Sequence, residues 1–275
     1  MKRFSFLQNL DADLKQSLMI QLRNLWTHTS TALEGNTLSL GETAFVIEEG
    51  LTVSGKPLKD HEEVVGHAQA IELIYSYLDR HGGITKEELF ELHKAIQTER
   101  ISDIYKPVGN WKVEPNGTTA ITDDQQQIFL EYAAPNNVPA LMQAWFDLLD
   151  RYCKADLDKD KALNAYAELH ISFVRIHPFF DGNGRIARLV ANLPVLKTGL
   201  PPIIIPTEKR REYIRLLSKY ELAVGQPVAG EALLPQKERL EDFIKFCGSS
   251  WKPSLEIVEA IADKQAMRNQ FRPGV

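Results

Sequence analysis

The sequence predicts a mainly α-helical fold with one β-hairpin. Through most of the 275 residues, apolar side chains recur at spacings of three and four, the period of an amphipathic helix. Capping residues, glycines and prolines stand where these periodic segments begin or end. One stretch, residues 105–122, loses the helical period and contains an Asn-Gly turn signal instead. We therefore expect a helical protein that carries a single small sheet.

The N-terminal region is predicted to form two helices. The first covers residues 11–26 with Asp11 as its cap, and the second covers residues 27–34 and stops at Gly35. The apolar stripe of the first helix is Leu14, Leu18, Leu22 and Leu25. Glu34 is oddly placed, because a carboxylate in a last turn faces the negative end of the helix dipole. It is either a solvated glutamate or the partner of a cation elsewhere in the fold.

Helical periodicity resumes after an irregular segment. Residues 43–55 are predicted to be irregular, with a short strand or turn, and residues 62–80 to form a helix ended by a Gly-Gly pair. Thr85 and Glu88 then make a capping box for the next helix. Two histidines within these helices lack metal-ligand spacing and are expected to be packed or surface side chains: His67 and His93.

Residues 105–122 are predicted to contain the hairpin. Asn116-Gly117 is expected to be its two-residue turn. This hairpin is either a structural loop or an exposed edge that holds an extended peptide by strand addition.

The C-terminal half returns to helix. Helices are expected over residues 138–153, 161–176, 210–222, 240–247 and 254–270, with a further helix from residue 186. The segment 161–176 is apolar on most faces, which is typical of a buried central helix. Pro194 is expected to kink or end the helix that begins at residue 186, and residues 201–206 to form an extended link.

Composition excludes several classes of protein. With 44% hydrophobic and 25% charged residues, the chain resembles a soluble globular protein. A net charge of −5 argues against a nucleic-acid-coating protein, although a local pocket for phosphates stays compatible with it.

Cys153 and Cys247 offer no disulfide framework, so we expect both to be buried packing residues in a reducing cytoplasm. The sequence has no signal peptide or membrane-length apolar run, so we expect a cytoplasmic protein without a membrane partner; secretion without a cleaved signal stays open.

The segment 177–188, His-Pro-Phe-Phe-Asp-Gly-Asn-Gly-Arg-Ile-Ala-Arg, carries the candidate chemistry. Pro178 ends the central helix, and the next helix starts after a glycine-rich turn. The turn residues let consecutive backbone amides converge, and the helix N-terminus adds free N–H groups: Gly182, Asn183 and Gly184. Together these features predict a phosphate site.

Charged residues of the same segment support a nucleotide phosphate chain. Arg185 and Arg188 lie three residues apart, hence on one helix face, and both can grip phosphate oxygens. Asp181 suits a magnesium ion, which typically takes one or two carboxylates plus phosphate oxygens. His177 can accept a proton at neutral pH, and the proton of a hydroxyl that attacks phosphorus is the obvious one. A calcium loop and a Walker loop are excluded, because neither the liganding glutamate nor a Lys-Ser/Thr pair is present.

These twelve residues resemble the signature of Fic-domain proteins, His-x-Phe-x-Asp/Glu-Gly-Asn-Gly-Arg-x-x-Arg, at every specified position. The resemblance extends over about residues 60–222. It implies a Fic-type helical bundle with one β-hairpin flap. It also implies transfer of AMP from ATP to a Ser, Thr or Tyr hydroxyl of a target protein, which is another protein or the chain itself.

The resemblance also implies roles for single residues. His177 is the catalytic base, and Asp181 holds Mg²⁺ on the α- and β-phosphates. The nucleotide-binding residues are Gly182, Asn183, Gly184, Arg185 and Arg188, the last of which grips the γ-phosphate. The flap that aligns the target peptide is expected around Trp111, Lys112 and Val113.

A second motif lies near the N-terminus. Residues 30–35, Ser-Thr-Ala-Leu-Glu-Gly, match the family's inhibitory helix, Ser/Thr-x-x-x-Glu-Gly/Asn. The inhibitory residues implied are Ser30, Glu34 and Gly35. In that class the glutamate pairs with the second motif arginine, here Arg188, and displaces the γ-phosphate. Some members with this glutamate also remove AMP.

The resulting prediction has three parts along the chain. Residues 1–45 hold the N-terminal helices with the inhibitory motif, residues 46–232 the Fic core, and residues 233–275 a C-terminal helical extension. Two alternatives stay open: a transferase for another nucleotide or phosphate-bearing group, and a nucleotide-sensing interaction protein. The segment between Tyr213 and Phe243 is longer than usual in the family, which leaves base specificity open. The target protein, the balance between AMP transfer and removal, and the oligomeric state, a homodimer included, are also not readable from the sequence.

Overall fold

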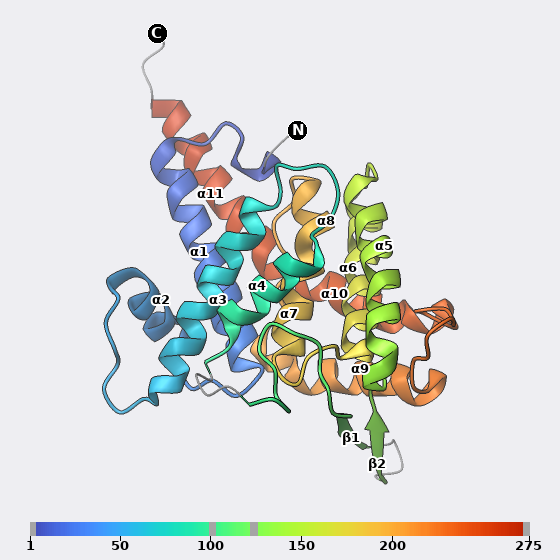
Figure 1. Ribbon diagram of the computed structural model, residues 1–275. Coiled ribbons are helices and arrows are strands. Elements are labelled where there is room, and N and C mark those ends of the chain that lie inside the picture. The colour runs from blue at the N-terminus through green and yellow to red at the C-terminus, as the bar shows by residue number, and fades with distance from the viewer. Residues whose placement is uncertain (1–3, 99–102, 122–125, 272–275) are drawn as a thin grey trace.

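The computed structural model describes residues 4–98, 103–121 and 126–271. Its helices are α1 (Ala12–Ala32), α2 (Leu40–Glu49), α3 (Leu58–Ser76), α4 (Lys86–Ile96), α5 (Val138–Lys154), α6 (Lys159–Ile176), α7 (Asn183–Val190), α8 (Asn192–Lys197), α9 (Arg210–Val224), α10 (Glu241–Ser250) and α11 (Lys252–Phe271). The strands β1 (Gly117–Ile121) and β2 (Gln127–Glu131) pair antiparallel. Figure 1 shows this hairpin at one end of the bundle, which confirms the mainly α fold with one hairpin.

Helix α6 lies at the centre of the bundle. It packs against α5, α7, α8 and α10, and most of its side chains are buried, as the apolar pattern predicted. The indole N–H of Trp145 on α5 donates to Leu169 O of α6 at 3.0 Å and ties the two helices together. Because α6 is held on every side, its C-terminal end at Ile176 is a rigid support for whatever follows it.

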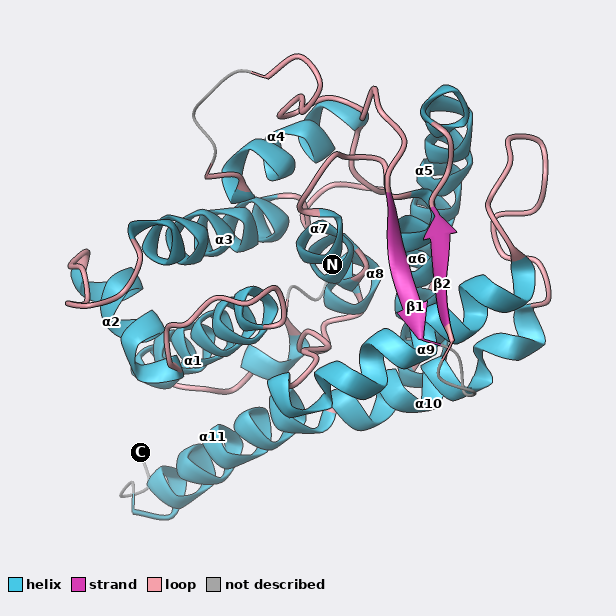
Figure 2. Cartoon of the chain, turned by 90° about the horizontal axis from the view of Figure 1, so that it is seen from below, coloured by secondary structure: helices cyan, strands magenta, loops and turns pink. Residues whose placement is uncertain are grey.

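The first and last helices lie side by side, as Figures 1 and 2 both show. Leucines of α1, Leu10 just before it and Ile261 of α11 form a small separate core: Leu10, Leu14, Leu18, Leu22 and Ile261. The other face of α1 contacts α3 and α7. The C-terminal end of α1 is thereby brought against the helix that follows the glycine-rich turn.

Two predictions about the N-terminal region were wrong. One helix, α1 (Ala12–Ala32), replaces the two expected over residues 11–26 and 27–34, and it continues through Thr29 and Thr31, whose Oγ1 atoms donate to carbonyls four residues earlier. Residues 40–49 form helix α2, where an irregular segment was expected. A capping box of Ser39 and Glu42 starts α2 and Gly50 ends it, and both signals stand in the sequence.

The predicted hairpin turn was also wrong. Asn116 precedes β1, and the strands are joined through residues 122–126. The side-chain Nδ2 of Asn116 donates to Phe179 O, so its amide is used in a tertiary contact rather than in a turn. Gly117 opens β1, where a Cβ atom would lie 2.4 Å from Leu130 O of the partner strand. The glycine is required by close strand approach.

Other local predictions were confirmed. The Thr85–Glu88 capping box starts α4 with both of its hydrogen bonds. The helix after the glycine-rich turn breaks at Ala191 into α7 and α8, because Pro194 has no N–H to donate to Val190 O. Both cysteines are free thiols; Cys247 is buried and Cys153 half-buried.

Candidate functional site

The loop from α6 to α7 brings the predicted residues together. His177 is the C-cap of α6 and has a φ of 50°, in the left-handed region that a non-glycine residue seldom adopts. Gly182, with a φ of 78°, is the N-cap of α7. A Cβ atom there would lie 2.6 Å from the side-chain amide of Gln97, so both conformation and space favour glycine.

His177 is held in one tautomer. Its Nδ1 donates to Val174 O at 3.0 Å, because a carbonyl can only accept, and this leaves the lone pair on Nε2. The ring stacks on Tyr132 with centroids 3.7 Å apart. Burial lowers the pKa of His177 to about 3, although its hydrogen bond to Val174 acts in the opposite direction. The ring is therefore neutral at pH 7 and able to accept a proton at Nε2.

Asn183 shapes the loop from inside. Its Oδ1 accepts from Phe179 N at 2.9 Å and its Nδ2 donates to Phe179 O at 2.8 Å. The side chain is 2% exposed, so it fixes the turn rather than reaching outward. The backbone amides at the start of α7 are left to face an anion, together with the positive end of the helix dipole.

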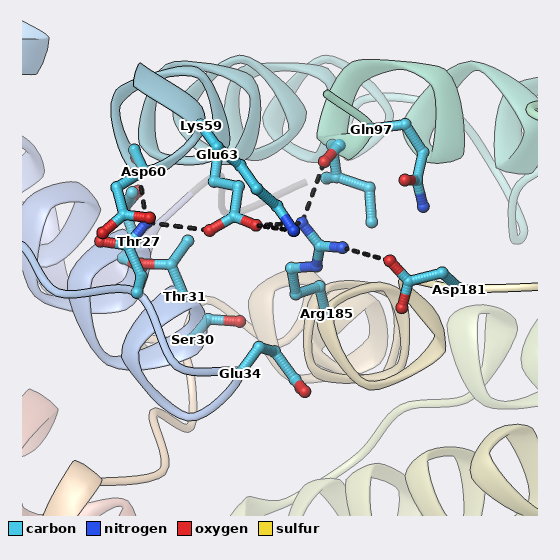
Figure 3. A network of polar contacts seen from close by, with 12 residues as sticks. Thr27, Ser30, Thr31, Glu34, Lys59, Asp60, Glu63, Gln97, Asp181 and Arg185 are labelled. Atoms are coloured by element: carbon cyan, nitrogen blue, oxygen red, sulfur yellow. Dashed lines mark hydrogen bonds and ion pairs between the residues drawn. The ribbon is translucent and has the colours of Figure 1, made fainter. Parts of the chain in front are cut away.

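Arg185 links three parts of the fold. Its guanidinium donates to Ile96 O at 3.1 Å and to Asp181 Oδ2 at 3.2 Å, and lies 3.9 Å from Glu63 Oε1. Figure 3 shows it between Glu63 and Asp181. The Asp181 side chain is 69% exposed and keeps oxygen capacity toward solvent. The described residues hold no cluster of three His, Cys, Asp or Glu side chains that could bind a metal ion.

Arg188 and Glu34 form an ion pair across the site. Arg188 Nη2 donates to Glu34 Oε1 at 2.6 Å. Two further bonds go to Ser30, from Nε to its Oγ at 3.0 Å and from Nη2 to its backbone oxygen at 2.9 Å. Burial acts to raise the pKa of Glu34, but the Arg188 guanidinium has the larger effect in the opposite direction and holds that pKa below its usual range. The local sequence left two interpretations of Glu34, a solvated glutamate or the partner of a distant cation. The structure shows the second, and the cation is Arg188.

The Glu34 carboxylate also lies over the glycine-rich turn. A Cβ atom added to Gly184 would come within 2.5 Å of Glu34 Oε1 and 3.0 Å of Arg188 Nη1. The carboxylate therefore stands close to the N-terminus of α7, where an anion is favoured. Gly35 follows with a φ of 103° and turns the chain away from α1.

The three predicted flap residues lie in the loop before β1, outside the hairpin strands. Trp111 packs edge-on against Phe90, with centroids 4.5 Å apart. Lys112 is only 2% exposed, whereas Val113 is 53% exposed. Only Val113 of the three offers most of its side chain to solvent.

Sequence reasoning missed several residues that contact the site. Tyr132 stacks on His177, Glu63 approaches Arg185, and Tyr213 Oη lies 3.4 Å from Arg188 Nη1. The buried His170 lies behind Tyr213, with its Nε2 3.0 Å from Tyr213 Oη. No local pattern marks Glu63, because its burial and its approach to Arg185 arise only from the packing of the helices.

A cavity of about 70 Å³ adjoins His177. Val174 and Tyr132, both in contact with His177, line it together with the apolar side chains Leu130, Ile171, Ile214 and Leu217. Glu221 also lines the cavity; it is 5% exposed, and its Oε2 accepts from Arg175 Nε at 2.8 Å. No described residue donates to the other oxygen, Oε1.

Comparisons with known proteins agree with this geometry. Residues 83–195 match the Fic/DOC family. "Protein adenylyltransferase fic-1" of Caenorhabditis elegans is 30% identical over 226 residues, which are 82% of this chain and 41% of that protein. "Protein adenylyltransferase Fic" of Drosophila willistoni is 30% identical over 191 residues, 68% of this chain and 35% of that protein. The chain thus spans less than half the length of these curated relatives.

Solved structures of Fic-domain proteins have the same fold as this chain. A Fic-domain-containing signaling protein from Bacteroides thetaiotaomicron superposes with a TM-score of 0.74 at 28% identity, over 94% of this chain and 95% of that one. Fic-1 of C. elegans superposes with a TM-score of 0.70 at 25% identity, over 95% of this chain and 70% of that one. Within the described residues, none of the helices is long and apolar enough to cross a bilayer.

Proposed function

This chain is a Fic-domain protein, and from that premise we propose that it transfers AMP from ATP to a Ser, Thr or Tyr hydroxyl of a target protein. The observation that carries the proposal is the 177–188 loop, which combines a proton acceptor with an anion site. His177 Nε2 holds a free lone pair, and the amides of α7 begin six residues further on, at Asn183. Acceptance of a proton and stabilisation of a phosphate are thus available side by side.

The proposed reaction is a displacement at the α-phosphorus. The target hydroxyl oxygen forms a bond to phosphorus, its proton passes to His177 Nε2, and the bond to the β-phosphate oxygen breaks to release pyrophosphate. The phosphates lie on the amides at the start of α7, with Arg185 and Arg188 binding their oxygens. Burial keeps His177 uncharged before reaction, and nearby phosphate charge raises its pKa and strengthens it as a base.

Asp181 is the residue that would hold magnesium. Its exposed carboxylate is a single ligand, which fits an ion that arrives with the phosphates and keeps several waters. When bound, such an ion neutralises phosphate charge. Arg185, which donates to Asp181, orients that carboxylate.

The cavity beside His177 is the proposed place of the nucleotide base. A base that enters it stacks among apolar side chains while its phosphates reach the glycine-rich turn. Glu221 lines the cavity, and a carboxylate accepts hydrogen bonds, so it favours a base with an amino group, such as adenine. ATP is therefore the proposed donor.

Glu34 is proposed to inhibit the transfer. Its carboxylate and a γ-phosphate compete for the same buried cation, Arg188, whose side chain is 3% exposed. Both anions cannot occupy the space beside Gly184 at once, since Glu34 Oε1 already lies there. The resting state is thus the closed one, with Ser30 holding Arg188 in place.

We also propose that the same carboxylate takes part in AMP removal. The Glu34 side chain is 42% exposed, so water reaches it while Oε1 is bound to Arg188. It can orient a water that attacks the AMP–protein bond. Incubation of an AMP-modified target with the unmodified enzyme should release AMP, whereas the Glu34→Gly variant should not.

Labelled ATP tests the transfer directly. Glu34→Gly with ATP and Mg²⁺ should label itself or proteins of a host lysate far more than the unmodified chain, and the double variant Glu34→Gly/His177→Ala should give no label. Equal label from all three would overturn the proposal. If Glu34→Gly binds ATP tightly without turnover, the chain is a nucleotide-sensing protein instead.

A further inference from the structure

His177 has a backbone conformation that needs outside support. A φ of 50° is unfavourable for a residue with a β-carbon, so the peptide groups on both sides must be held by their surroundings. Pro178, the next residue, has no N–H of its own to donate. His177 N donates to Phe173 O at 2.9 Å, so the carbonyl groups around His177 are the remaining places where the turn can be fixed.

Two residues before β1 hold three of these carbonyl groups. Lys112 donates its backbone N–H to Pro178 O at 2.8 Å, and its Nζ lies 3.5 Å from Ile176 O. Asn116 donates its Nδ2 to Phe179 O at 3.0 Å. One short segment thus contacts the carbonyl of Ile176, the residue before His177, and those of Pro178 and Phe179, the two residues after it.

The two side chains also hold each other. Lys112 Nζ donates to Asn116 Oδ1 at 2.5 Å, which fixes the amide so that its NH₂ group faces Phe179 O. Asn116 O in turn accepts from Tyr132 N at 3.0 Å, and the Tyr132 ring stacks on His177. The same pair therefore reaches His177 from its backbone and from its ring face.

We propose that Lys112 and Asn116 are positioning residues that hold the His177 imidazole in its reactive orientation and tautomer. This inference rests on the proposed role of His177 as the base. It also gives the buried Lys112 a task other than contact with a target peptide, because a side chain 2% exposed cannot present its ammonium to one. Three charged groups act on the His177 ring: Lys112, Asp181 and Glu34.

A matched pair of variants tests the inference in the Glu34→Gly background. Lys112→Met keeps the backbone bond to Pro178 and most of the side-chain volume but removes the ammonium. Asn116→Asp keeps an acceptor for Lys112 but removes the donor to Phe179 O. Lys161→Met, an exposed lysine that pairs with Asp158, is the control.

Two measurements separate positioning from simple structural support. The first is kcat for AMP transfer together with the KM for ATP. In both variants kcat should fall roughly ten- to a hundredfold, the range for a displaced catalytic group, while KM stays within about twofold. The second is ¹⁵N NMR of the His177 ring, which should change from one tautomer, Nδ1–H, to an average of two.

The outcomes distinguish this inference from the function on which it rests. The inference is overturned if both variants fold, keep the kcat of the Glu34→Gly parent and show an unchanged His177 tautomer. It is also overturned if the control Lys161→Met loses kcat to the same extent. If Lys112→Met does not fold, Asn116→Asp alone decides. If the Glu34→Gly parent transfers no AMP while both variants still change the His177 tautomer, the proposed function fails and the positioning role stands.

Discussion

Glu34 and Arg188, 154 residues apart in the chain, meet with Oε1 and Nη2 separated by 2.6 Å. The contact joins the end of α1 to the first helix after the glycine-rich turn, and it puts a carboxylate where an anionic ligand would bind. Ser30 supplies two more acceptors to the same guanidinium.

Ser30→Ala should open the site in part. The change removes the acceptor of Arg188 Nε but leaves the Ser30 carbonyl and Glu34 in place, so Arg188 is held less firmly. The affinity for ATP, measured by calorimetry, should rise in the order unmodified chain, Ser30→Ala, Glu34→Gly. Ser17→Ala, on the same helix and bonded to Gln21, serves as the control. An affinity in Ser30→Ala equal to that of the unmodified chain would contradict the expected order.

Glu34→Gly should lower stability without nucleotide. Removal of the carboxylate leaves the Arg188 charge buried, although Ser30 still accepts from it. We expect a loss of about 1–2 kcal/mol in the free energy of unfolding, between the values for exposed and fully buried pairs, because Glu34 is partly exposed. Saturating ATP should raise the free energy of unfolding of the variant by more than this loss, and by more than it raises that of the unmodified chain. Urea unfolding with and without ATP measures both; an unchanged midpoint without ATP would argue that Ser30 alone satisfies Arg188.

Acid should destabilise the protein through its buried histidines. Burial lowers the pKa of His93 to about 4 and that of His170 to about 3, against 6.5 in the unfolded chain. The unfolded state then binds more protons, so stability is full above pH 6.5 and falls as pH drops toward these folded-state values. At pH 5 each of the two histidines costs about 2 kcal/mol.

Two experiments check this pH dependence. The free energy of unfolding in urea should be clearly lower at pH 5 than at pH 7. In the folded protein, the ring signals of His93 and His170 should stay unchanged by NMR between pH 7 and 5, while free histidine in the same buffer titrates. Titration of either ring in that window would show that the imidazole is not kept neutral by burial.

Glu221 should recognise the amino group of the base by accepting a hydrogen bond from it. In the Glu34→Gly background, ATP should bind roughly tenfold more tightly than purine riboside triphosphate, which lacks that amino group, as expected for one hydrogen bond to a charged acceptor. Glu221→Gln should reduce the ratio, because its amide oxygen is a weaker, uncharged acceptor. Glu231→Gln, in the loop after α9, provides the control. Equal affinity for the two nucleotides in the parent would place the base elsewhere.

The sequence determined the local features of the site. Gly182 and Gly184 marked the turn, Pro178 ended the central helix, and the apolar faces of residues 161–176 predicted its burial. Glu34 stood out before any partner was known, since a carboxylate at a helix C-terminus is unfavourable. Each of these signals depends on neighbours within a few residues, which one sequence displays directly.

Only the tertiary structure decided which distant groups meet. The family resemblance had implied that Glu34 pairs with Arg188, and the packing of α1 against α3 and α7 brings the two together. The loop before β1 buried Lys112 beneath the turn of His177, which no local pattern indicated. Asn116-Gly117 has the sequence of a turn, but neither residue forms one. Asn116 donates to Phe179 O, and Gly117 begins β1 because only glycine fits next to Leu130 O. Backbone chemistry fixes a residue's conformation over a few positions, whereas its partners depend on how whole helices pack, and that is a property of the assembled core.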